Sequence, residues 1–301
     1  MIVKEGVRDF DLVHIFECGQ CFRWEREPDG SYTGMASGAA PANISFHPSA
    51  GCKYSGRLVI DGGEISGGGK AGGGKAGGEK FWDGYFDLSR DYGAIKKGLS
   101  EGDAVMAEAV MFGQGIRILG QDIWETVVSF IISQNNNIGR IKGCIASLCD
   151  NFGGFSGEFR GKKYHEIPGA EVLAGLTESD LAVCRLGYRA RYLIETAKAV
   201  SADKGEKLYS AGSAGAKEAF SYLTSLCGVG PKVANCIMLF SMGMYGSFPI
   251  DVWVRQAMSR LYGIDKDDVK AMESYARDNF GEYGGIAQQY LFYYMRSKKG
   301  D

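Results

Sequence analysis

The sequence predicts an α+β fold, with a small twisted antiparallel β-sheet domain at residues 1–116 and a mainly α-helical core at residues 117–301. Up to about residue 60, short β-type runs such as Arg57-Leu-Val-Ile60 are punctuated by Gly, Pro and Asn. Beyond Arg117, apolar residues recur at helical spacing. A chain of 301 residues with 45% hydrophobic content can bury the core of one large domain or of two ordinary ones.

Two helices are expected near the start of the helical core. In each of them the apolar residues share one face, as in an amphipathic helix. These residues are Ile123, Trp124, Val127, Val128 and Ile131 in the first helix, and Ile138, Ile141, Ile145 and Leu148 in the second. The polar run Asn135-Asn136-Asn137 falls between the two helices and is expected to form a loop.

A glycine-rich segment interrupts the N-terminal domain at about residues 62–80. Ten of the 17 residues from Gly62 to Gly78 are glycine, and the motif Gly-Gly-Gly-Lys-Ala is repeated. This composition offers too little apolar surface to offset the entropy that is lost on ordering. We therefore expect a flexible surface insertion.

The most informative stretch is residues 223–236, which read Leu-Thr-Ser-Leu-Cys-Gly-Val-Gly-Pro-Lys-Val-Ala-Asn-Cys. Gly228 and Gly230 permit a turn between two helices that is too tight for side chains. Pro231 suits the first position of the second helix, where its missing N–H is not needed. Exposed backbone N–H groups at such a helix start can bind phosphate, and we assign this role to Gly228, Gly230 and Val233. The pattern is typical of a helix-hairpin-helix clamp for nucleic acid.

Lys232 lies just inside the second helix of this hairpin, and Asp251 follows nineteen residues later. In many such hairpins the lysine only pairs with phosphate, so the motif alone leaves a catalytic role open. Asp251 fits the N-cap of a helix whose apolar residues share a face. Those residues are Val254, Ala257, Met258 and Leu261. Capping and a catalytic role can coexist at a helix start.

The hairpin Gly-Val-Gly-x-Lys-Val-Ala-x-Cys followed by Pro-x-Asp251 resembles the catalytic core of the helix-hairpin-helix DNA glycosylases with the Gly/Pro-Asp signature. Within that superfamily the lysine marks the members that are both glycosylase and lyase. Further segments resemble the eukaryotic-type 8-oxoguanine DNA glycosylases, in the same order along the chain. They are residues 17–24 (ECGQCFRW), 81–88 (FWDGYFDL), 133–140 (SQNNNIGR), 186–192 (LGYRARY) and 287–292 (AQQYLF).

The resemblance implies a base-excision repair enzyme that removes 8-oxoguanine from duplex DNA, and the residue types fit this chemistry. A lysine attacks the sugar only as a neutral amine, and the positive end of a helix dipole disfavours the charged form of Lys232. Asp251 would stabilise the oxocarbenium-like transition state. Because an amine attacks, the intermediate is a Schiff base, which commits the enzyme to a lyase step that cleaves the strand 3′ to the lesion.

The resemblance also implies a pocket for the extruded base. Cys236 and Phe292 would sandwich the base, and Gln288 would pair with its Watson–Crick edge. Gln288 and Phe292 lie four residues apart, hence on one helical face, although Phe292 could equally be an ordinary core residue. The carbonyl of Gly19 would accept the hydrogen that oxidised guanine carries on N7, a bond worth about 1–3 kcal/mol. The alternative for Gly19 is a plain turn glycine.

For the partner strand, the resemblance assigns Asn135 to the vacated space, Tyr188 to a wedge between bases, and Arg140 and Arg189 to the orphaned cytosine. Arginine suits cytosine because the exposed edge of that base offers acceptors. The alternatives are a loop asparagine, a buried tyrosine and solvated arginines. All four residues together predict a preference for cytosine opposite the lesion.

The chain departs from the family pattern at two positions. Trp253 stands two residues after the aspartate, where many relatives have histidine, so a phosphate contact there is in doubt. Cys227 replaces the usual proline before the hairpin, which should alter only local rigidity. A monovalent ion could bridge the hairpin to phosphate through backbone carbonyls of the hairpin, as such hairpins often do. The candidate carbonyls are those of Thr224, Leu226 and Val229.

No cofactor is expected to be required. No cysteine follows Cys236, so an iron–sulfur cluster of the kind that some related glycosylases carry is not expected. Cys18 and Cys21 form a CxxC pair, but no second pair follows at ligand spacing, so we expect no metal site. The absence of a secretory segment and of an apolar run of ~18 residues predicts an intracellular protein without a membrane span, in the cytoplasm or nucleoid, or in the nucleus of a eukaryote.

We expect a monomer whose partner is double-stranded DNA containing oxidised guanine. The net charge of −2 gives no bulk signature of nucleic-acid binding, so binding must depend on local placement of charge. Lys70, Lys75 and Lys80 of the glycine-rich segment are a minor candidate for nonspecific DNA contacts. Two other functions stay open, namely a glycosylase of the same scaffold for another damaged purine and a noncatalytic DNA-damage binder.

Overall fold

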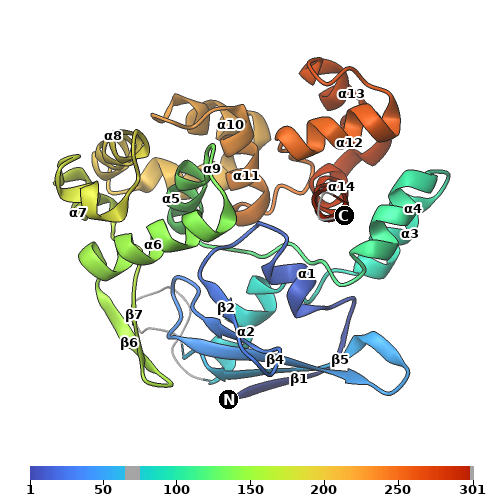
Figure 1. Cartoon of the computed structure of the whole chain (residues 1–301), viewed down its shortest axis with the longest axis horizontal. Helices are drawn as coiled ribbons and strands as arrows, with labels where there is room; N and C mark the ends of the chain where they lie inside the picture. The colour runs from blue at the N-terminus through green and yellow to red at the C-terminus, as the bar shows by residue number, and fades with distance from the viewer. Residues whose placement is uncertain (65–74, 299–301) are drawn as a thin grey trace.

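The computed structural model describes residues 1–64 and 75–298 and confirms the expected α+β architecture. A five-stranded sheet forms one end of the molecule, and the helices of the core are gathered above it (Figure 1). No helix within the described ranges is both long and apolar enough to cross a membrane.

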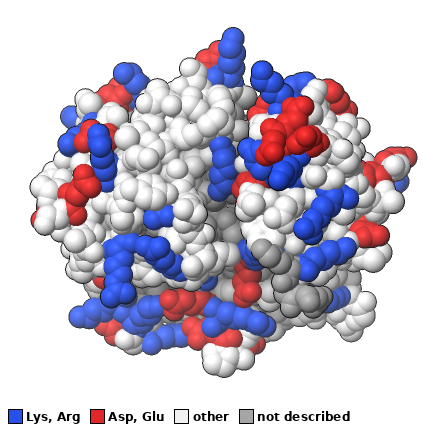
Figure 2. Space-filling view, turned by 45° about the horizontal axis from the view of Figure 1, so that its top comes forward, with Lys and Arg blue, Asp and Glu red and all other residues white. Residues whose placement is uncertain are grey.

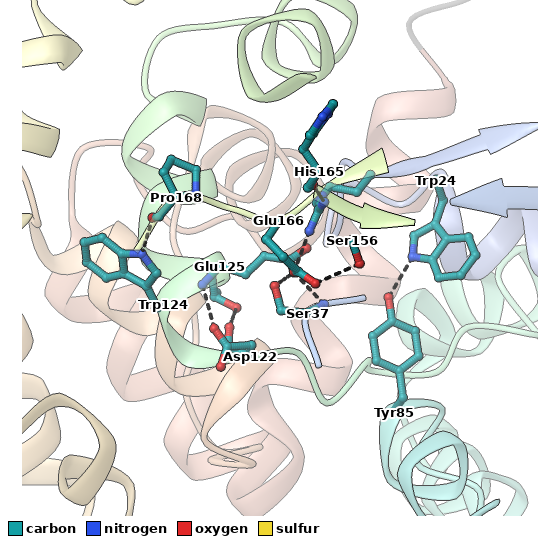
Figure 3. Close-up of polar contacts among 12 residues, drawn as sticks. Trp24, Ser37, Tyr85, Asp122, Trp124, Glu125, Ser156, His165, Glu166 and Pro168 are labelled. Carbon is teal, nitrogen blue, oxygen red and sulfur yellow. Dashed lines mark hydrogen bonds and ion pairs between the residues drawn. The ribbon is translucent and has the colours of Figure 1, made fainter. Parts of the chain in front are cut away.

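The N-terminal sheet is antiparallel throughout, in the order β1-β5-β4-β3-β2. Its strands are β1 (Ile2–Arg8), β2 (Trp24–Arg26), β3 (Tyr32–Gly34), β4 (Ala42–Ser49) and β5 (Cys52–Gly62). Helices α1 (Leu12–Phe16) and α2 (Lys75–Tyr85) pack aromatic residues into one cluster with it. Trp24 Nε1 donates to the hydroxyl of Tyr85 at 2.8 Å, so the sheet and α2 are also joined by a polar contact (Figure 3).

Regular structure extends into both ends of the glycine-rich segment. Strand β5 continues to Gly62, and α2 already begins at Lys75, so the expectation of a flexible insertion over 62–80 does not hold for residues 75–80. Apolar residues later in α2, among them Trp82, are fully buried against the sheet and explain why a helix with several glycines is stable. The part of the expected insertion at residues 65–74 lies outside the described residues.

Helices α3 (Tyr92–Ser100) and α4 (Ala104–Phe112) follow the sheet domain. Their buried residues, such as Met106 and Ala109, belong to the apolar cluster of the helical core, and α4 packs against the last helix of the chain. A division of the chain between residues 116 and 117 stays a prediction.

The helical core is built around α5 (Ile123–Ser133), which is followed by α6 (Ile138–Phe152). Both helices were expected, but α5 is buried on nearly all sides from Trp124 to Ile132, so it is not amphipathic. A hairpin of β6 (Phe155–Phe159) and β7 (Lys162–His165), which was not expected, extends from α6 toward the sheet domain (Figure 1).

The remaining helices complete the core. They are α7 (Ala170–Ala174), the 3₁₀ helix η1 (Asp180–Cys184), α8 (Arg189–Ser201), α9 (Glu206–Ala214), α10 (Ala216–Ser225), α11 (Pro231–Ser241), α12 (Val252–Tyr262), α13 (Val269–Phe280), the 3₁₀ helix η2 (Gly281–Tyr283) and α14 (Gly284–Ser297).

A buried polar junction joins the sheet domain, α5 and the β6–β7 hairpin (Figure 3). Glu125 Oε2 accepts hydrogen bonds from the backbone N–H and the hydroxyl of Ser37, at 3.0 and 2.6 Å. The same oxygen lies 3.5 Å from Arg23 Nη1, and both side chains of this ion pair are only 7% exposed. Arg23 Nη2 donates to the carbonyl of His165 at 2.5 Å. The junction therefore links the sheet region, the start of α5 and the β6–β7 hairpin.

We expect Glu125→Gln to lower the free energy of unfolding by about 3 kcal/mol, because it leaves the buried guanidinium of Arg23 without a charged partner. The matched control is Glu25→Gln. Glu25 pairs with Lys162 at 2.8 Å, but their side chains are 67% and 52% exposed, so this loss should stay below about 1 kcal/mol. Urea unfolding of the two variants measures the difference, and equal losses would contradict the prediction.

Candidate active site

The expected helix-hairpin-helix is present, with α10 and α11 joined by residues 226–230. Gly228 has φ +75°, and a Cβ added there would lie 2.6 Å from the side chain of Tyr192. Gly230 is the N-cap of α11 without any side-chain cap, and Pro231 occupies the first turn. The start of α11 therefore presents backbone N–H groups that no side chain covers.

Two neighbouring helices hold the hairpin through its carbonyl groups. Thr196 Oγ1 of α8 donates to the carbonyl of Cys227 at 2.6 Å. Gln134 Nε2, at the end of α5, donates to the carbonyl of Gly228 at 2.9 Å. These bonds give the hairpin a fixed position without a proline at position 227.

Gly228→Ala should lower the free energy of unfolding by about 3 kcal/mol, since it combines a strained positive φ with a clash against Tyr192. Gly263 separates the two effects, because it has φ +70° with nothing within 4 Å of an added Cβ. Gly263→Ala should therefore lower the free energy of unfolding by about 1 kcal/mol, from backbone strain alone. Gly230→Ala, with negative φ and open space, should stay within about 0.5 kcal/mol. Urea unfolding ranks the three variants, and a Gly228→Ala loss no larger than that of Gly263→Ala would exclude the clash.

All six residues assigned to catalysis and to the damaged-base pocket line one cavity of about 50 Å³. They come from three distant parts of the chain: the loop after α1, the hairpin with the start of α12, and α14. The complete lining is Cys18, Gly19, Phe130, Lys232, Cys236, Phe240, Pro249, Asp251, Gln288, Gln289 and Phe292.

Lys232 and Cys236 lie one turn apart on α11. The Nζ atom of Lys232 lies 5.1 Å from the centroid of the Phe130 ring, which is on α5. Burial raises the pKa of the Cys236 thiol to about 11, against the opposing charge of Lys232. At neutral pH Cys236 therefore offers the cavity an uncharged, polarisable wall rather than a thiolate.

Asp251 caps α12, as expected. Its Oδ1 accepts from the backbone N–H groups of Trp253 and Val254, each at 2.9 Å. Burial raises the pKa of the Asp251 carboxyl above its ordinary value, although these hydrogen bonds and the charge of Lys232 oppose the rise. Since both helix bonds end on Oδ1, the geometry lets the carboxylate cap the helix and face the cavity.

Helix α14 supplies the polar side chain of Gln288 and the aromatic ring of Phe292 to the cavity. Gln288 is only 4% exposed, and its Oε1 atom is buried without a hydrogen-bond partner among the described residues. A buried acceptor without a donor is costly, so this amide is suited to a ligand that donates a hydrogen bond. Phe292 is half-buried and packs onto the apolar cluster of the helical core. One part of its ring can therefore pack in the core while the exposed part contacts a base.

The loop that carries Gly19 is held in place by α14. Gly19 has φ +82°, and an added Cβ would lie 3.2 Å from Cε1 of Phe292, so another residue here would be strained and crowded. This backbone conformation agrees with the alternative of a turn glycine. Gln289 Nε2 donates to the carbonyl of Cys18 at 2.6 Å, and Arg296 Nη2 donates to the carbonyl of Glu17. The backbone at Gly19 is therefore fixed relative to Phe292.

Sequence reasoning missed the residues that fix this loop. Gln20 is fully buried, and its Nε2 donates to the carbonyls of Ile15 and Arg117, both at 2.9 Å. Gln20 and Gln289 stand next to predicted pocket residues, and Arg296 lies four residues after Phe292. Adjacency to Gly19 and Gln288 was thus the available signal, but the partners of these side chains are up to 279 residues away.

The residues assigned to the partner strand gather at the loop between α5 and α6. Asn135 has φ +46° in this loop, and Tyr188 is 50% exposed, so the alternative of a buried tyrosine is wrong. Arg140 is exposed, with Nη2 3.3 Å from the carbonyl of Arg185. Arg189 is only 3% exposed, so the alternative of a solvated arginine is wrong for this position.

The guanidinium of Arg189 binds backbone carbonyls of the loop. It donates from Nε to Gln134 at 2.8 Å, from Nη2 to Gln134 and Asn135, and from Nη1 to Leu186 at 3.1 Å. Its charge also lies over the ring of Tyr188, at 4.6 Å from the centroid. Arg189 therefore supports the loop, which the sequence alone did not indicate.

Charges of both signs are mixed on the face seen in Figure 2, and the described residues contain no metal-binding group. Figure 2 shows Lys and Arg side chains interspersed with Asp and Glu over one face, around a hollow near its centre. Within residues 1–64 and 75–298, no three His, Cys, Asp or Glu side chains are grouped as a metal site would require, and Cys18 and Cys21 are buried free thiols. Recognition of a polyanion on this surface would have to use local groups such as the start of α11.

The fold and the cavity define a DNA glycosylase of the helix-hairpin-helix type. A family model described as "8-oxoguanine DNA glycosylase, N-terminal domain" matches residues 2–127, and one described as "HhH-GPD superfamily base excision DNA repair protein" matches residues 128–281. The chain belongs to the HhH-GPD superfamily of base excision DNA repair proteins, in the group with the 8-oxoguanine DNA glycosylase N-terminal domain.

Similar proteins extend this finding. The chain is 33% identical over 288 residues to the N-glycosylase/DNA lyase OGG1 of Arabidopsis thaliana, a match covering 92% of this chain and 75% of the plant protein. It is 40% identical over 187 residues to an N-glycosylase/DNA lyase of Saccharomyces cerevisiae, covering 56% of this chain and about half (48%) of the yeast protein. A Clostridium acetobutylicum 8-oxoguanine glycosylase/lyase, solved with double-stranded DNA containing cytosine opposite 8-oxoG, has a TM-score of 0.87 at 38% identity and 99% coverage of both chains. The resemblance expected from the sequence is confirmed.

Proposed function

We propose that this protein excises 8-oxoguanine from duplex DNA and then cleaves the strand at the resulting site, as a bifunctional glycosylase/lyase. One observation carries the proposal: a lysine, an aspartate and a buried, unpartnered glutamine oxygen line the same cavity as Gly19, Cys236 and Phe292. A damaged purine nucleotide supplies ring N–H donors of its base to the glutamine and the anomeric carbon of its sugar to the lysine. The relatives' printed activities support the same assignment.

The chemistry uses the residues of the hairpin and the start of α12. The neutral amine of Lys232 attacks C1′ of the sugar, the bond from C1′ to the base nitrogen breaks, and the base leaves with that electron pair and takes up a proton. The carboxylate of Asp251 stabilises the positive charge that develops on the sugar. The attacking nitrogen gives up one proton to the departing base. The C1′–O4′ bond of the sugar then breaks as the nitrogen lone pair forms the C=N bond of a Schiff base with Lys232, and O4′ takes up a proton from solvent to become the C4′ hydroxyl. Removal of a C2′ proton then expels the 3′ phosphate, which breaks the strand 3′ to the lesion.

Recognition requires the base to leave the duplex, since a base stacked in the helix cannot reach the residues that line the cavity. Cys236 and Phe292 would flank the base, with the neutral thiol on one face and the ring on the other. Gln288 would pair with its Watson–Crick edge. The Gly19 carbonyl would accept from N7–H of the oxidised base and repel the N7 acceptor of guanine.

The loop between α5 and α6 would meet the partner strand. Asn135 would enter the vacated space, and Tyr188 would wedge between bases. Arg140, which is exposed, is well placed for direct contact with the orphaned cytosine. Arg189 would contact that base through the N–H of Nη1 that remains beside its bond to Leu186.

The hairpin would bind a phosphate through the backbone N–H groups of Gly228, Gly230 and Val233. A monovalent ion held by hairpin carbonyls, including that of Leu226, stays part of this proposal, and no other cofactor is invoked. Trp253 would take part only through its backbone N–H, which donates to Asp251. No phosphate contact is assigned to its side chain. The proposed partner is double-stranded DNA bound by a monomer, inside the cell.

The test is base release and strand cleavage on matched duplexes containing 8-oxoguanine, or another damaged purine, opposite each of the four bases. Release of 8-oxoguanine with cleavage, fastest opposite cytosine, is expected. Release of a different purine would favour the alternative glycosylase. Tight binding without release of any base, and without a borohydride-trapped adduct, would favour a noncatalytic damage binder and overturn the proposal.

A further inference from the structure

We infer that Gln134 is a positioning residue that links the loop facing the partner strand to the catalytic hairpin, so that the base opposite the lesion affects the placement of Lys232. This inference rests on the proposed function. Gln134 ends helix α5 with an extended backbone, φ −60° and ψ 126°, and Asn135 follows with φ +46°. The chain therefore leaves the buried helix and enters the loop at this residue.

The side chain of Gln134 binds the hairpin. Its Nε2 donates to the carbonyl of Gly228 at 2.9 Å and to that of Ile131 at 3.2 Å, so both amide hydrogens have acceptors. Gly228 is 94 residues away in the sequence. The bond needs a donor at position 134, because a carboxylate there would face the Gly228 carbonyl with lone pairs only.

The backbone of Gln134 binds the residues assigned to the partner strand. Its carbonyl accepts from Nε and Nη2 of Arg189 and lies 3.4 Å from the hydroxyl of Tyr188. Arg189 Nη2 also donates to the carbonyl of Asn135 at 2.8 Å. One residue thus joins the start of α8, the α5–α6 loop and the hairpin.

The hairpin position sets the position of the lysine. Gly228 is four residues before Lys232, and the rigid helix α11 begins between them at Pro231. A displacement of the loop by an ill-fitting base opposite the lesion would move the Gln134 carbonyl and, through its amide, the Gly228 carbonyl. The second hydrogen bond to a hairpin carbonyl, from Thr196 of α8 to Cys227, has neither donor nor acceptor in the α5–α6 loop, so it provides the comparison.

The experiment compares Gln134→Ala with Thr196→Val, each of which removes one hydrogen bond to a hairpin carbonyl. Single-turnover excision of 8-oxoguanine is measured opposite cytosine and opposite adenine. We expect Gln134→Ala to reduce the ratio of the excision rate opposite cytosine to that opposite adenine about fivefold, which corresponds to the loss of one hydrogen bond. Thr196→Val should slow both reactions by the same factor. Equal slowing of both reactions by Gln134→Ala would overturn the inference and leave Gln134 with a merely structural role.

Hydrogen exchange on the protein alone tests the link without relying on activity. Gln134→Ala should increase amide exchange both in residues 186–192 and in residues 226–230, whereas Thr196→Val should increase it in residues 226–230 and leave residues 186–192 unchanged. Unchanged exchange in either segment of Gln134→Ala refutes the link. If wild-type protein releases no 8-oxoguanine, the proposed function fails, and the exchange result still decides whether the two segments are coupled.

Discussion

Lys232→Gln is expected to abolish the covalent adduct that borohydride traps between wild-type protein and DNA containing 8-oxoguanine, and to slow base release by roughly 10³-fold or more. Glutamine keeps the polarity and most of the length of the side chain but has no nucleophilic amine. The residue lies in the second position of α11, so its backbone contribution to the helix start should persist. Gel analysis of trapped complexes and single-turnover kinetics measure the two effects.

Lys217→Gln is the matched control. Lys217 lies in the first turn of α10, on the other arm of the same helix-hairpin-helix, and is exposed away from the cavity. This variant should form the adduct at the wild-type rate. A trapped adduct in Lys232→Gln would mean that another amine is the nucleophile, and the mechanism would then have to be assigned to a different residue.

The cavity was predictable from sequence because its residues occupy short motifs whose local geometry is nearly forced. Gly228 and Gly230 require a tight turn, Pro231 starts a helix, and Asp251 caps another. Local rules thus place Lys232 and Asp251 at two helix starts. That these starts meet Gly19 and Gln288 in one cavity followed from the family resemblance, since no local pattern encodes contacts between residues this far apart.

The supporting contacts were not predictable for the same physical reason. Gln134 reads as part of a polar run, yet its amide binds a hairpin 94 residues later. Arg189 reads as a surface arginine, but three backbone carbonyl groups satisfy its guanidinium and permit its burial. Composition also predicted too long a flexible insertion at the glycine-rich segment. The burial of Trp82 stabilises helix α2, although glycine is locally unfavourable in a helix.

Asp251 gives the protein a pH dependence whose sign follows from burial. The pKa of its carboxyl in the folded protein is raised above the ordinary value of 3.8. At pH values between 3.8 and the raised pKa, the folded protein therefore holds a proton that the unfolded chain has lost. The contribution of Asp251 to the free energy of unfolding is therefore greatest at acid pH and is lost as the pH rises through the raised pKa. Catalysis shows the opposite trend, because the mechanism needs the ionised carboxylate.

Asp251→Asn should consequently slow base release by roughly 10²–10³-fold at neutral pH while the fold persists. Asparagine can still accept the backbone N–H groups of Trp253 and Val254, and it removes a buried charge, so the free energy of unfolding at neutral pH should equal or exceed that of wild type. Asp268→Asn is the control, since Asp268 also caps a helix, accepting from the backbone N–H of Ala271 outside the cavity, and it should keep wild-type kinetics.

Single-turnover rates over about pH 4.5–8 complete the test of Asp251. In wild type the rate should fall on acidification with a midpoint above 3.8, since burial makes the carboxylate harder to form. In Asp251→Asn no ionisation occurs at this position, so the small residual rate should lack that acid limb. An acid limb with the same midpoint in both proteins would assign it to another group and would remove Asp251 from the charge-stabilising role, whatever its value as a helix cap.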